Sequence, residues 1–319
     1  MAETKKRKKI ISIAIPCYRS INNIEQVVSD IKDEFKKHKE YEYQIILAND
    51  GSPDDTFLKI RELCKKDKKI VGIDLSRNYS QANCRMSMLR YVDGDYVVFM
   101  DDDGQHPVDG IFRMIEKIDE GYDVVCARLI NKKCSAFKRI TSDIYNRIMV
   151  LLGVYPKGVK VSPFFAWNRF AINEAKKYHS PSPSIHSYML RITTRFANID
   201  IEQHERLSGR SGYTLKKLFS LAFMNLTNFS IVPLRISIFV GTTISILGLL
   251  YGMILIIRKI VNPSILLGYT SLMATMLFLI GIVLIILGLL GEYIGRMYMM
   301  MSDLPQYTIR EVINADRRD

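Results

Sequence analysis

Two long uncharged apolar runs near the end of the chain constrain its fold more than any other feature. No Asp, Glu, Lys or Arg occurs from 236 to 257, and none occurs from 260 to 291. A run of about 18 such residues is long enough to cross the hydrocarbon region of a bilayer. Two runs in tandem are rare in soluble folds, so we predict a transmembrane helical hairpin rather than two buried core helices. Arg258, Lys259 and 262–264 are expected to form its turn.

Basic residues beside the two runs predict the orientation of the hairpin. The turn carries Arg258 and Lys259. A larger basic set flanks the other side: Lys216, Lys217, Arg235, Arg296 and Arg310. Lys and Arg are enriched in the loops that stay on the cytoplasmic side of a membrane. We therefore expect both termini in the cytoplasm.

The formal net charge of +12 includes a basic arm from Lys5 to Lys9. Such an arm can indicate nucleic-acid binding, but no recognition motif follows it. We interpret 1–9 as a basic tail that aids solubility or is attracted to anionic lipid headgroups, at about 1 kcal/mol per basic residue near the surface. No nucleic-acid partner is expected.

The cysteines give no sign of a disulfide or zinc framework. The chain has five of them, an odd number, and no C-x-x-C pair. They are typical of reduced thiols in a cytosolic domain.

Strand-like and helix-like segments alternate over the first two-thirds of the chain. The strand-like runs are 11–15, 43–48, 70–75, 96–100 and 122–127, and the helix-like segments between them are 24–35, 57–64, 82–91 and 108–118. This alternation predicts an α/β domain whose mostly parallel sheet is covered by helices on both faces. In such sheets ligands bind beyond the carboxyl ends of the strands.

Polar or acidic residues follow four of the predicted strands. They are Pro16-Cys17-Tyr18, Asn49-Asp50-Gly51-Ser52, Ser76-Arg77-Asn78 and Asp101-Asp102-Asp103-Gly104-Gln105. A single acidic turn would carry little information. Four such segments at one end of a parallel sheet describe a binding site.

The carboxylate run at 101–103 is the sharpest chemical feature of this edge. Asp101 and Asp103 can offer two hard oxygen ligands to one divalent cation, and Gln105 can add a neutral oxygen. A solvated turn or a helix N-cap is the alternative for an isolated D-D-D-G. The neighbouring Asp50 and Tyr18 favour binding of a diphosphate through Mg²⁺ or Mn²⁺. The chain has no G-x-G-x-x-G after its first strand and no G-x-x-x-x-G-K-[ST], which argues against a dinucleotide dehydrogenase or a P-loop enzyme.

The chain resembles a known family in these and other motifs. I-P-C-Y (15–18), N-D-G-S (49–52) and D-D-D-G-Q-H-P (101–107) look like those of the family 2 inverting glycosyltransferases, which have a GT-A-like fold. Further segments are similar to the polyprenyl-phosphate branch, which includes the dolichol- and undecaprenyl-phosphate sugar synthases. They are S-R-N-Y-S-Q (76–81), R-L-S-G-R-S-G-Y-T-L-K-K-L (206–218), F-S-I-V-P-L-R (229–235) and G-E-Y-I-G-R (291–296).

The resemblance implies roles for individual residues. The donor would be bound by Pro16, Tyr18, Asp50, Asp102, Arg206 and Ser211, the last two from a loop that closes over the phosphates. Asp101, Asp103 and Gln105 would bind Mg²⁺ or Mn²⁺. Arg128, Lys138 and Ser142 would receive the lipid phosphate, and with Asp101 and Asp103 they form the expected catalytic set.

The sequence departs from the family pattern in two places. The family often has two acids where this chain has Asn49-Asp50, so only Asp50 supplies a carboxylate there. Many relatives carry G-D-F-R-L-M near the acceptor site, where this chain reads S-P-F-F-A-W-N-R (162–169). The sugar specificity of those relatives is therefore not carried over.

The implied reaction is inverting transfer of a sugar from a nucleotide-sugar, a UDP-sugar first, to a polyprenyl phosphate, undecaprenyl phosphate first. The transfer would take place on the cytosolic face of a bacterial plasma membrane, and its product would be a donor for cell-envelope glycosylation. The acceptor phosphate is already ionised at neutral pH, so it needs positioning and cationic neighbours more than a general base. Relatives in this branch are often homo-oligomers, and we expect the same here.

The expected organisation follows from these segments. A cytosolic glycosyltransferase domain spans 10–213, an amphipathic juxtamembrane helix spans 214–234, two transmembrane helices span 235–293, and a cytosolic tail spans 294–319. The juxtamembrane segment repeats apolar residues every three or four positions, as in helices that lie in the headgroup region. A helix packed on its own catalytic domain is the alternative.

Two other functions share part of this pattern. A processive polysaccharide synthase would carry a Q-x-x-R-W motif and usually more spans, whereas the one tryptophan here is Trp167, in F-A-W-N-R. A non-catalytic membrane sensor of nucleotide-sugar would be expected to have an eroded metal site, but Asp101, Asp103 and Gln105 are all present.

Overall fold

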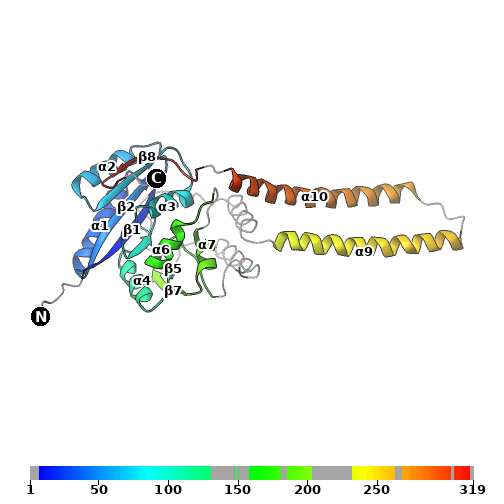
Figure 1. Cartoon of the computed structure of the whole chain (residues 1–319), viewed down its shortest axis with the longest axis horizontal. Coiled ribbons are helices and arrows are strands. Elements are labelled where there is room, and N and C mark those ends of the chain that lie inside the picture. Colours follow the sequence, from blue (N-terminus) through cyan, green and yellow to red (C-terminus); the bar gives the residue numbers. More distant parts are fainter. Residues whose placement is uncertain are drawn as a thin grey trace. The chain divides into compact units, whose positions relative to one another are not determined.

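A computed structural model describes most of the chain (Figure 1). The described residues are 7–130, 147, 150, 158–180, 185–202, 232–262, 268–302 and 305–316. The chain forms two compact units, one of Met1–Leu215 with Pro305–Asp319 and one of Lys216–Leu304.

The first unit is built on an eight-stranded sheet in the order β7-β5-β6-β4-β1-β2-β3-β8. Its strands are β1 (Lys9–Cys17), β2 (Tyr41–Asn49), β3 (Ile70–Leu75), β4 (Tyr96–Phe99), β5 (Val124–Ile130), β6 (Phe165–Asn168), β7 (Phe196–Glu202) and β8 (Ile309–Ile313). The pairs β1–β2, β1–β4, β2–β3 and β5–β7 are parallel. Strand β6 is antiparallel to both of its neighbours, and β8 is antiparallel to β3.

Helices cover both faces of this sheet because its strands are apolar on both sides. In β2, Ile45 and Leu47 belong to one core cluster, whereas Ile46 and Ala48 belong to the other. This is the alternation of a strand buried on both faces. The first cluster packs against α1 (Ile24–Lys37), α2 (Thr56–Lys66) and α4 (Asp109–Asp119), and the second against α3 (Gln81–Leu89), α6 (Arg169–Lys176) and α7 (Ile185–Ile192).

The predicted mostly parallel α/β domain is confirmed by these pairings. The predicted strands and helices are all present, with boundaries that differ by a few residues. Strand β1 extends through Cys17, so Pro16 and Cys17 lie in the strand and not after it. Strands β6, β7 and β8 were not anticipated.

The second unit contains two long helices, α9 (Val232–Val261) and α10 (Tyr269–Met301). In their most apolar spans, Ile236–Ile254 and Phe278–Met301, none of the residues whose burial the structure describes is buried. A soluble core helix would bury such a face, so the exposed apolar surface fits a lipid environment.

The predicted turn of the hairpin was wrong in one detail. Arg258 and Lys259 lie inside α9, which continues to Val261. Arg and Lys are good helix formers, so their charge does not end a helix. Of the predicted juxtamembrane helix, 214–231 lies outside the described residues, and 232–234 forms the start of α9.

Candidate active site

The carboxyl ends of the four central parallel strands lie at one edge of the sheet. Cys17 of β1 is level with Asn49 of β2, and Asn49 is level with Asp74 of β3. On the other side Ala14 is level with Phe99 of β4. The segments that follow these strands therefore meet, as the sequence predicts.

Asp50 is the buried carboxylate of this edge. It is 4% exposed, and its Oδ1 accepts a hydrogen bond of 2.7 Å from the backbone N–H of Tyr79. Burial raises the pKa of Asp50, and backbone hydrogen bonds from Tyr79 and Ser80 oppose that rise. The loop after β3 thus holds Asp50 in place.

Gly51 explains why this loop can approach so closely. Its φ is +60°, and a Cβ at this position would lie 2.3 Å from the carbonyl carbon of Arg77. Only glycine combines this backbone conformation with that contact. The N-D-G-S segment and the loop after β3 therefore form one packed unit.

Asp101 is held by side chains from α3. Its Oδ1 accepts hydrogen bonds from Gln81 Nε2 at 2.7 Å and from Arg85 Nη2 at 3.0 Å. Its backbone N–H donates to His106 Nδ1 at 3.0 Å, and the His106 ring stacks on Phe164. His106 is buried and acts here as a support for the Asp101 backbone.

Asp102 and Asp103 have different surroundings. The hydroxyl of Ser20 donates to Asp102 Oδ2. Burial raises the pKa of Asp102 to about 6, with Asp101 and Asp103 adding repulsion to its charged form. Asp103 Oδ1 accepts from the backbone N–H of Gln105 at 3.1 Å, across the turn at Gly104.

The donor set at this edge fits a hard divalent cation in its chemistry. Carboxylate and amide oxygens are the ligands that Mg²⁺ and Mn²⁺ prefer, with phosphate and water completing the shell. Among the described residues no three His, Cys, Asp or Glu side chains converge as a metal site.

Tyr18 lies at the mouth of this edge. Its side chain is 46% exposed, and the guanidinium of Arg19 lies 5.6 Å from its ring centre. Arg19 has a φ of 58°, and its N–H donates to Ser52 Oγ at 2.7 Å. Pro16 lies two residues before Tyr18, within β1. An exposed ring fixed in this way can stack on a flat ligand group.

Arg128 occupies the same edge farther along the sheet. Through β6, Cys126 is level with Phe99, so Arg128 is level with the start of the Asp101 loop. Two strand spacings separate β4 from β5, about 10 Å. Its guanidinium makes a two-point ion pair with Asp200 of β7, in which Nη2 lies 2.6 Å from Oδ2. The other expected residues, Lys138, Ser142, Arg206 and Ser211, lie outside the described residues.

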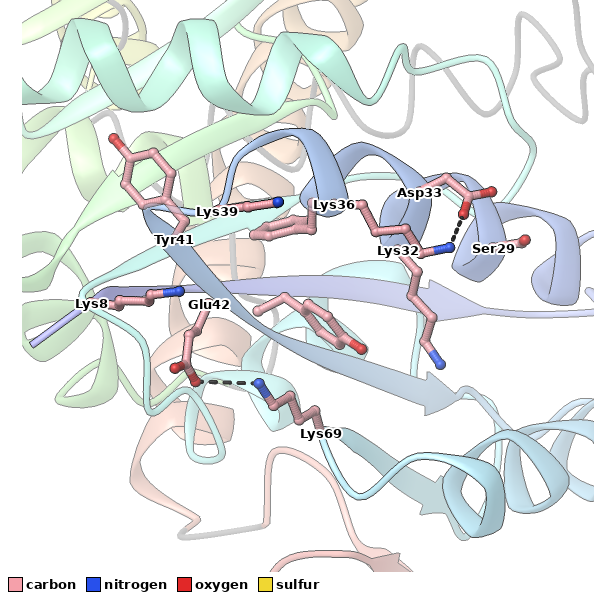
Figure 2. A pocket seen from close by; sticks show the side chains of 11 residues that line it. Lys8, Ser29, Lys32, Asp33, Lys36, Lys39, Tyr41, Glu42 and Lys69 are labelled. Carbon is pink, nitrogen blue, oxygen red and sulfur yellow. Dashed lines mark hydrogen bonds and ion pairs between the residues drawn. The ribbon is translucent and has the colours of Figure 1, made fainter.

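A hollow of about 460 Å³ lies at the opposite edge of the sheet, beside the amino ends of β1 and β2 (Figure 2). Its wall contains Lys8, Lys32, Lys36, Lys39 and Lys69, with ion pairs from Lys36 to Asp33 and from Lys69 to Glu42. It shares no residue with the predicted donor site.

Sequence reasoning missed Gln81 and Arg85, the side chains that hold Asp101. Gln81 was visible as the last residue of S-R-N-Y-S-Q. Arg85 follows one helical turn later, so the two share a face of α3. The sequence gives no sign that Arg85 is buried against Asp101, because that contact depends on how α3 packs.

Comparisons with known proteins place the chain in a family. Residues 12–176 match glycosyl transferase family 2, and 232–297 match the GtrB C-terminal hairpin. The undecaprenyl-phosphate 4-deoxy-4-formamido-L-arabinose transferase of Proteus mirabilis (strain HI4320) is 31% identical, over 96% of this chain and 95% of that protein. The bactoprenol glucosyl transferase of Shigella phage SfX is 30% identical, over 94% and 98%.

A more distant likeness comes from a solved structure, the glucosyl-3-phosphoglycerate synthase of Mycobacterium tuberculosis with Mn²⁺ and UDP-glucose. It is 18% identical, with a TM-score of 0.49, and covers 69% of this chain and 78% of that one. No ligand is assigned to the present chain from it. Family membership rests on the sequence matches: the chain belongs to glycosyl transferase family 2, is a glycosyltransferase, and is membrane-associated through a C-terminal hairpin of helices.

Proposed function

We propose that the protein transfers a sugar from a nucleoside-diphosphate sugar, a UDP-sugar first, to undecaprenyl phosphate. The observation that carries this proposal is the full-length match to enzymes named for undecaprenyl-phosphate and bactoprenol substrates, which extends through the hairpin. The two relatives differ in the sugar that their names give, so the sugar for this chain stays open.

The donor would bind at the edge that carries Tyr18, Asp50 and the 101–103 loop. Tyr18 is exposed for stacking on a base, and the Asp50 carboxylate would accept a hydrogen bond from a ribose hydroxyl. Pro16 would line the same subsite, and Asp102 would lie beside the diphosphate. Arg206 and Ser211 would close over the phosphates.

Asp101, Asp103 and Gln105 would hold Mg²⁺ or Mn²⁺. When bound there, the cation would neutralise charge that develops on the departing nucleoside diphosphate. Gln81 and Arg85, both on α3, position Asp101 through hydrogen bonds to its carboxylate. Arg128, Lys138 and Ser142 would bind the acceptor phosphate, whose ionised oxygen attacks the anomeric carbon directly and inverts it.

The path of the chain supports a cytosolic site for the reaction. Strands β1 to β7 precede α9, whereas β8 follows α10, and β8 pairs with β3. The hairpin therefore leaves and rejoins one domain, and two crossings return a chain to the side that it left. The excess of Lys and Arg beside the ends of the hairpin favours the cytoplasm for that side.

A transfer assay tests this proposal. Purified full-length protein in detergent is given Mg²⁺ or Mn²⁺, undecaprenyl phosphate and a panel of UDP- and GDP-sugars. We expect lipid-linked product from one donor, and no product after chelation of the metal. Nucleotide binding without product from any donor would contradict the proposed reaction.

A further inference from the structure

The segment that follows the second long helix returns to the catalytic domain as its edge strand. Strand β8 pairs with β3, with a bulge between Asp74 and Leu75. Asn314, at a φ of 62°, donates from its Nδ2 to the carbonyls of Cys64 at 2.7 Å and Ile70 at 2.8 Å. These bonds fix the tail beyond what an edge strand alone would provide.

The tail also holds the first residue of the loop after β3. The Ser76 N–H donates to the Thr308 carbonyl at 2.9 Å, and Arg310 Nη2 donates to the Ser76 carbonyl at 3.0 Å. Both backbone polar groups of Ser76 are thus bound by the tail. Hydrogen bonds from Ser76 and then Thr308 lower the pKa of the Tyr79 hydroxyl, which places that ring against the same segment.

Two routes lead from these tail residues to the predicted donor subsite. In the first, the loop that begins at Ser76 reaches Tyr79, whose N–H binds Asp50 at 2.7 Å. In the second, Arg310 Nη1 lies 3.9 Å from Asp74 Oδ2, and Asp74 Oδ1 accepts from Asn49 Nδ2 at 2.8 Å. Arg310 therefore contacts Asp74, which binds Asn49, and Ser76, the first residue of the loop that binds Asp50.

We propose that the tail after the membrane hairpin is a positioning element for the nucleoside part of the donor, with Arg310 as its main residue. This inference rests on the proposed function, because it takes the edge at Asp50 as the donor subsite. Arg310 is 66% exposed and its ion pair is long, so it adds little to global stability. Its effect falls on the placement of the loop and therefore on donor affinity.

Arg310→Ala tests the proposal, with Glu311→Ala as the matched control. Glu311 is the next residue of β8 and also makes one exposed ion pair, at 2.7 Å to Arg61 of α2. The Glu311 backbone is level with Asp74 in the ladder, but no side-chain hydrogen bond or ion pair found in the described residues joins Glu311 to Ser76 or Asp74. UDP and GDP are each titrated calorimetrically into full-length protein with Mg²⁺, and the tighter of the two is used for the variants.

We expect Arg310→Ala to raise the dissociation constant about five- to tenfold, the loss of roughly one good hydrogen bond to the site. Glu311→Ala should change it less than twofold, and Arg310→Lys should give an intermediate value. Both alanine variants should keep the wild-type unfolding temperature and the wild-type KM for lipid phosphate. Equal dissociation constants for the two alanine variants would overturn this inference and leave the proposed function unaffected. Failure of the wild type to bind either nucleotide would overturn the proposed function and the inference with it.

Discussion

The guanidinium of Arg85 lies 3.0 Å from the carboxylate of Asp101, and the two side chains are only 8% and 23% exposed. Asp101 is therefore partly neutralised before any cation binds. Asp103 also accepts a hydrogen bond, from the backbone N–H of Gln105. We expect both carboxylates to bind a divalent cation.

Asp103→Ala should therefore abolish metal-dependent turnover and leave the fold intact. Loss of a charged ligand that stabilises the leaving group should lower kcat at least about 100-fold. Initial rates across a Mg²⁺ titration would measure the effect, and the unfolding temperature would report on the fold. Asp109→Ala, an exposed acid in the first turn of α4, is the control. Near wild-type rates for Asp103→Ala would remove the metal assignment.

Asp50→Asn should weaken nucleotide binding and stabilise the folded state. Burial raises the pKa of Asp50, so its ionised form destabilises the folded state above that pKa, and the penalty disappears as the pH falls through it. Asn keeps an acceptor for the Tyr79 N–H without the charge. We expect a higher unfolding temperature than wild type at pH 7.5, a gap that narrows toward acid pH, and nucleotide affinity weaker by about tenfold or more.

Asp54→Asn provides a control of opposite sign for that experiment. Burial raises the pKa of Asp54, but hydrogen bonds from Ser52 and Thr56 outweigh it and hold the pKa below its ordinary value. The ionised form therefore stabilises the fold above the ordinary pKa, and this contribution is lost in acid. Asp54→Asn should unfold at a lower temperature than wild type at pH 7.5. If the unfolding temperatures of the two variants changed with pH in the same way, the opposite pKa shifts of Asp50 and Asp54 would be contradicted.

Arg128→Ala should raise the KM for lipid phosphate about tenfold, the loss of a charge-assisted hydrogen bond, and change the donor KM less than twofold. Asp200→Asn is the informative partner variant, because it removes the ion pair but keeps the guanidinium. Its acceptor KM should stay at or below the wild-type value. If Arg128 only ties β5 to β7, both variants will behave alike in steady-state assays with varied lipid.

Local pattern was enough to predict the first five strands of the sheet, but not β6, β7 or β8. The apolar residues of α1, from Ile24 to Phe35, recur at helical spacing, and all five are buried. Strand β8 has no such signal. Its five residues, I-R-E-V-I, do not alternate between apolar and charged side chains, and its partner β3 lies more than two hundred residues earlier in the sequence, so only the tertiary fold reveals the pairing.

The candidate site was predictable in its acids and less so in their supports. Asp50, Asp101 and Asp103 follow strands, and strand ends of a parallel sheet must meet. Arg85 and Arg310 act through hydrogen bonds to residues far away in sequence. Nothing in their own neighbourhood distinguishes them from surface cations, so their roles depend on geometry.

Removal of the tail should weaken nucleotide binding, whereas removal of the hairpin should weaken the use of the lipid acceptor. A chain that stops after Leu304 keeps both long helices and loses β8, which exposes the edge of β3 and frees the Ser76 backbone. We expect its nucleotide affinity to fall more than tenfold, because two hydrogen bonds that hold the loop are lost. A synthetic peptide of residues 305–316 added in excess should restore part of that affinity.

The complementary variant deletes 216–304 and joins 215 to 305 through a flexible Gly/Ser linker, whose length adds little entropic cost. It keeps β8 and lacks the hairpin. We expect it to bind nucleotide like the full chain, as measured by calorimetry, and to use undecaprenyl phosphate in vesicles poorly. Efficient transfer to lipid in vesicles would mean that the helices are dispensable. Loss of nucleotide binding here, with binding intact in the chain that stops after Leu304, would show that the hairpin supports the donor site and the tail does not.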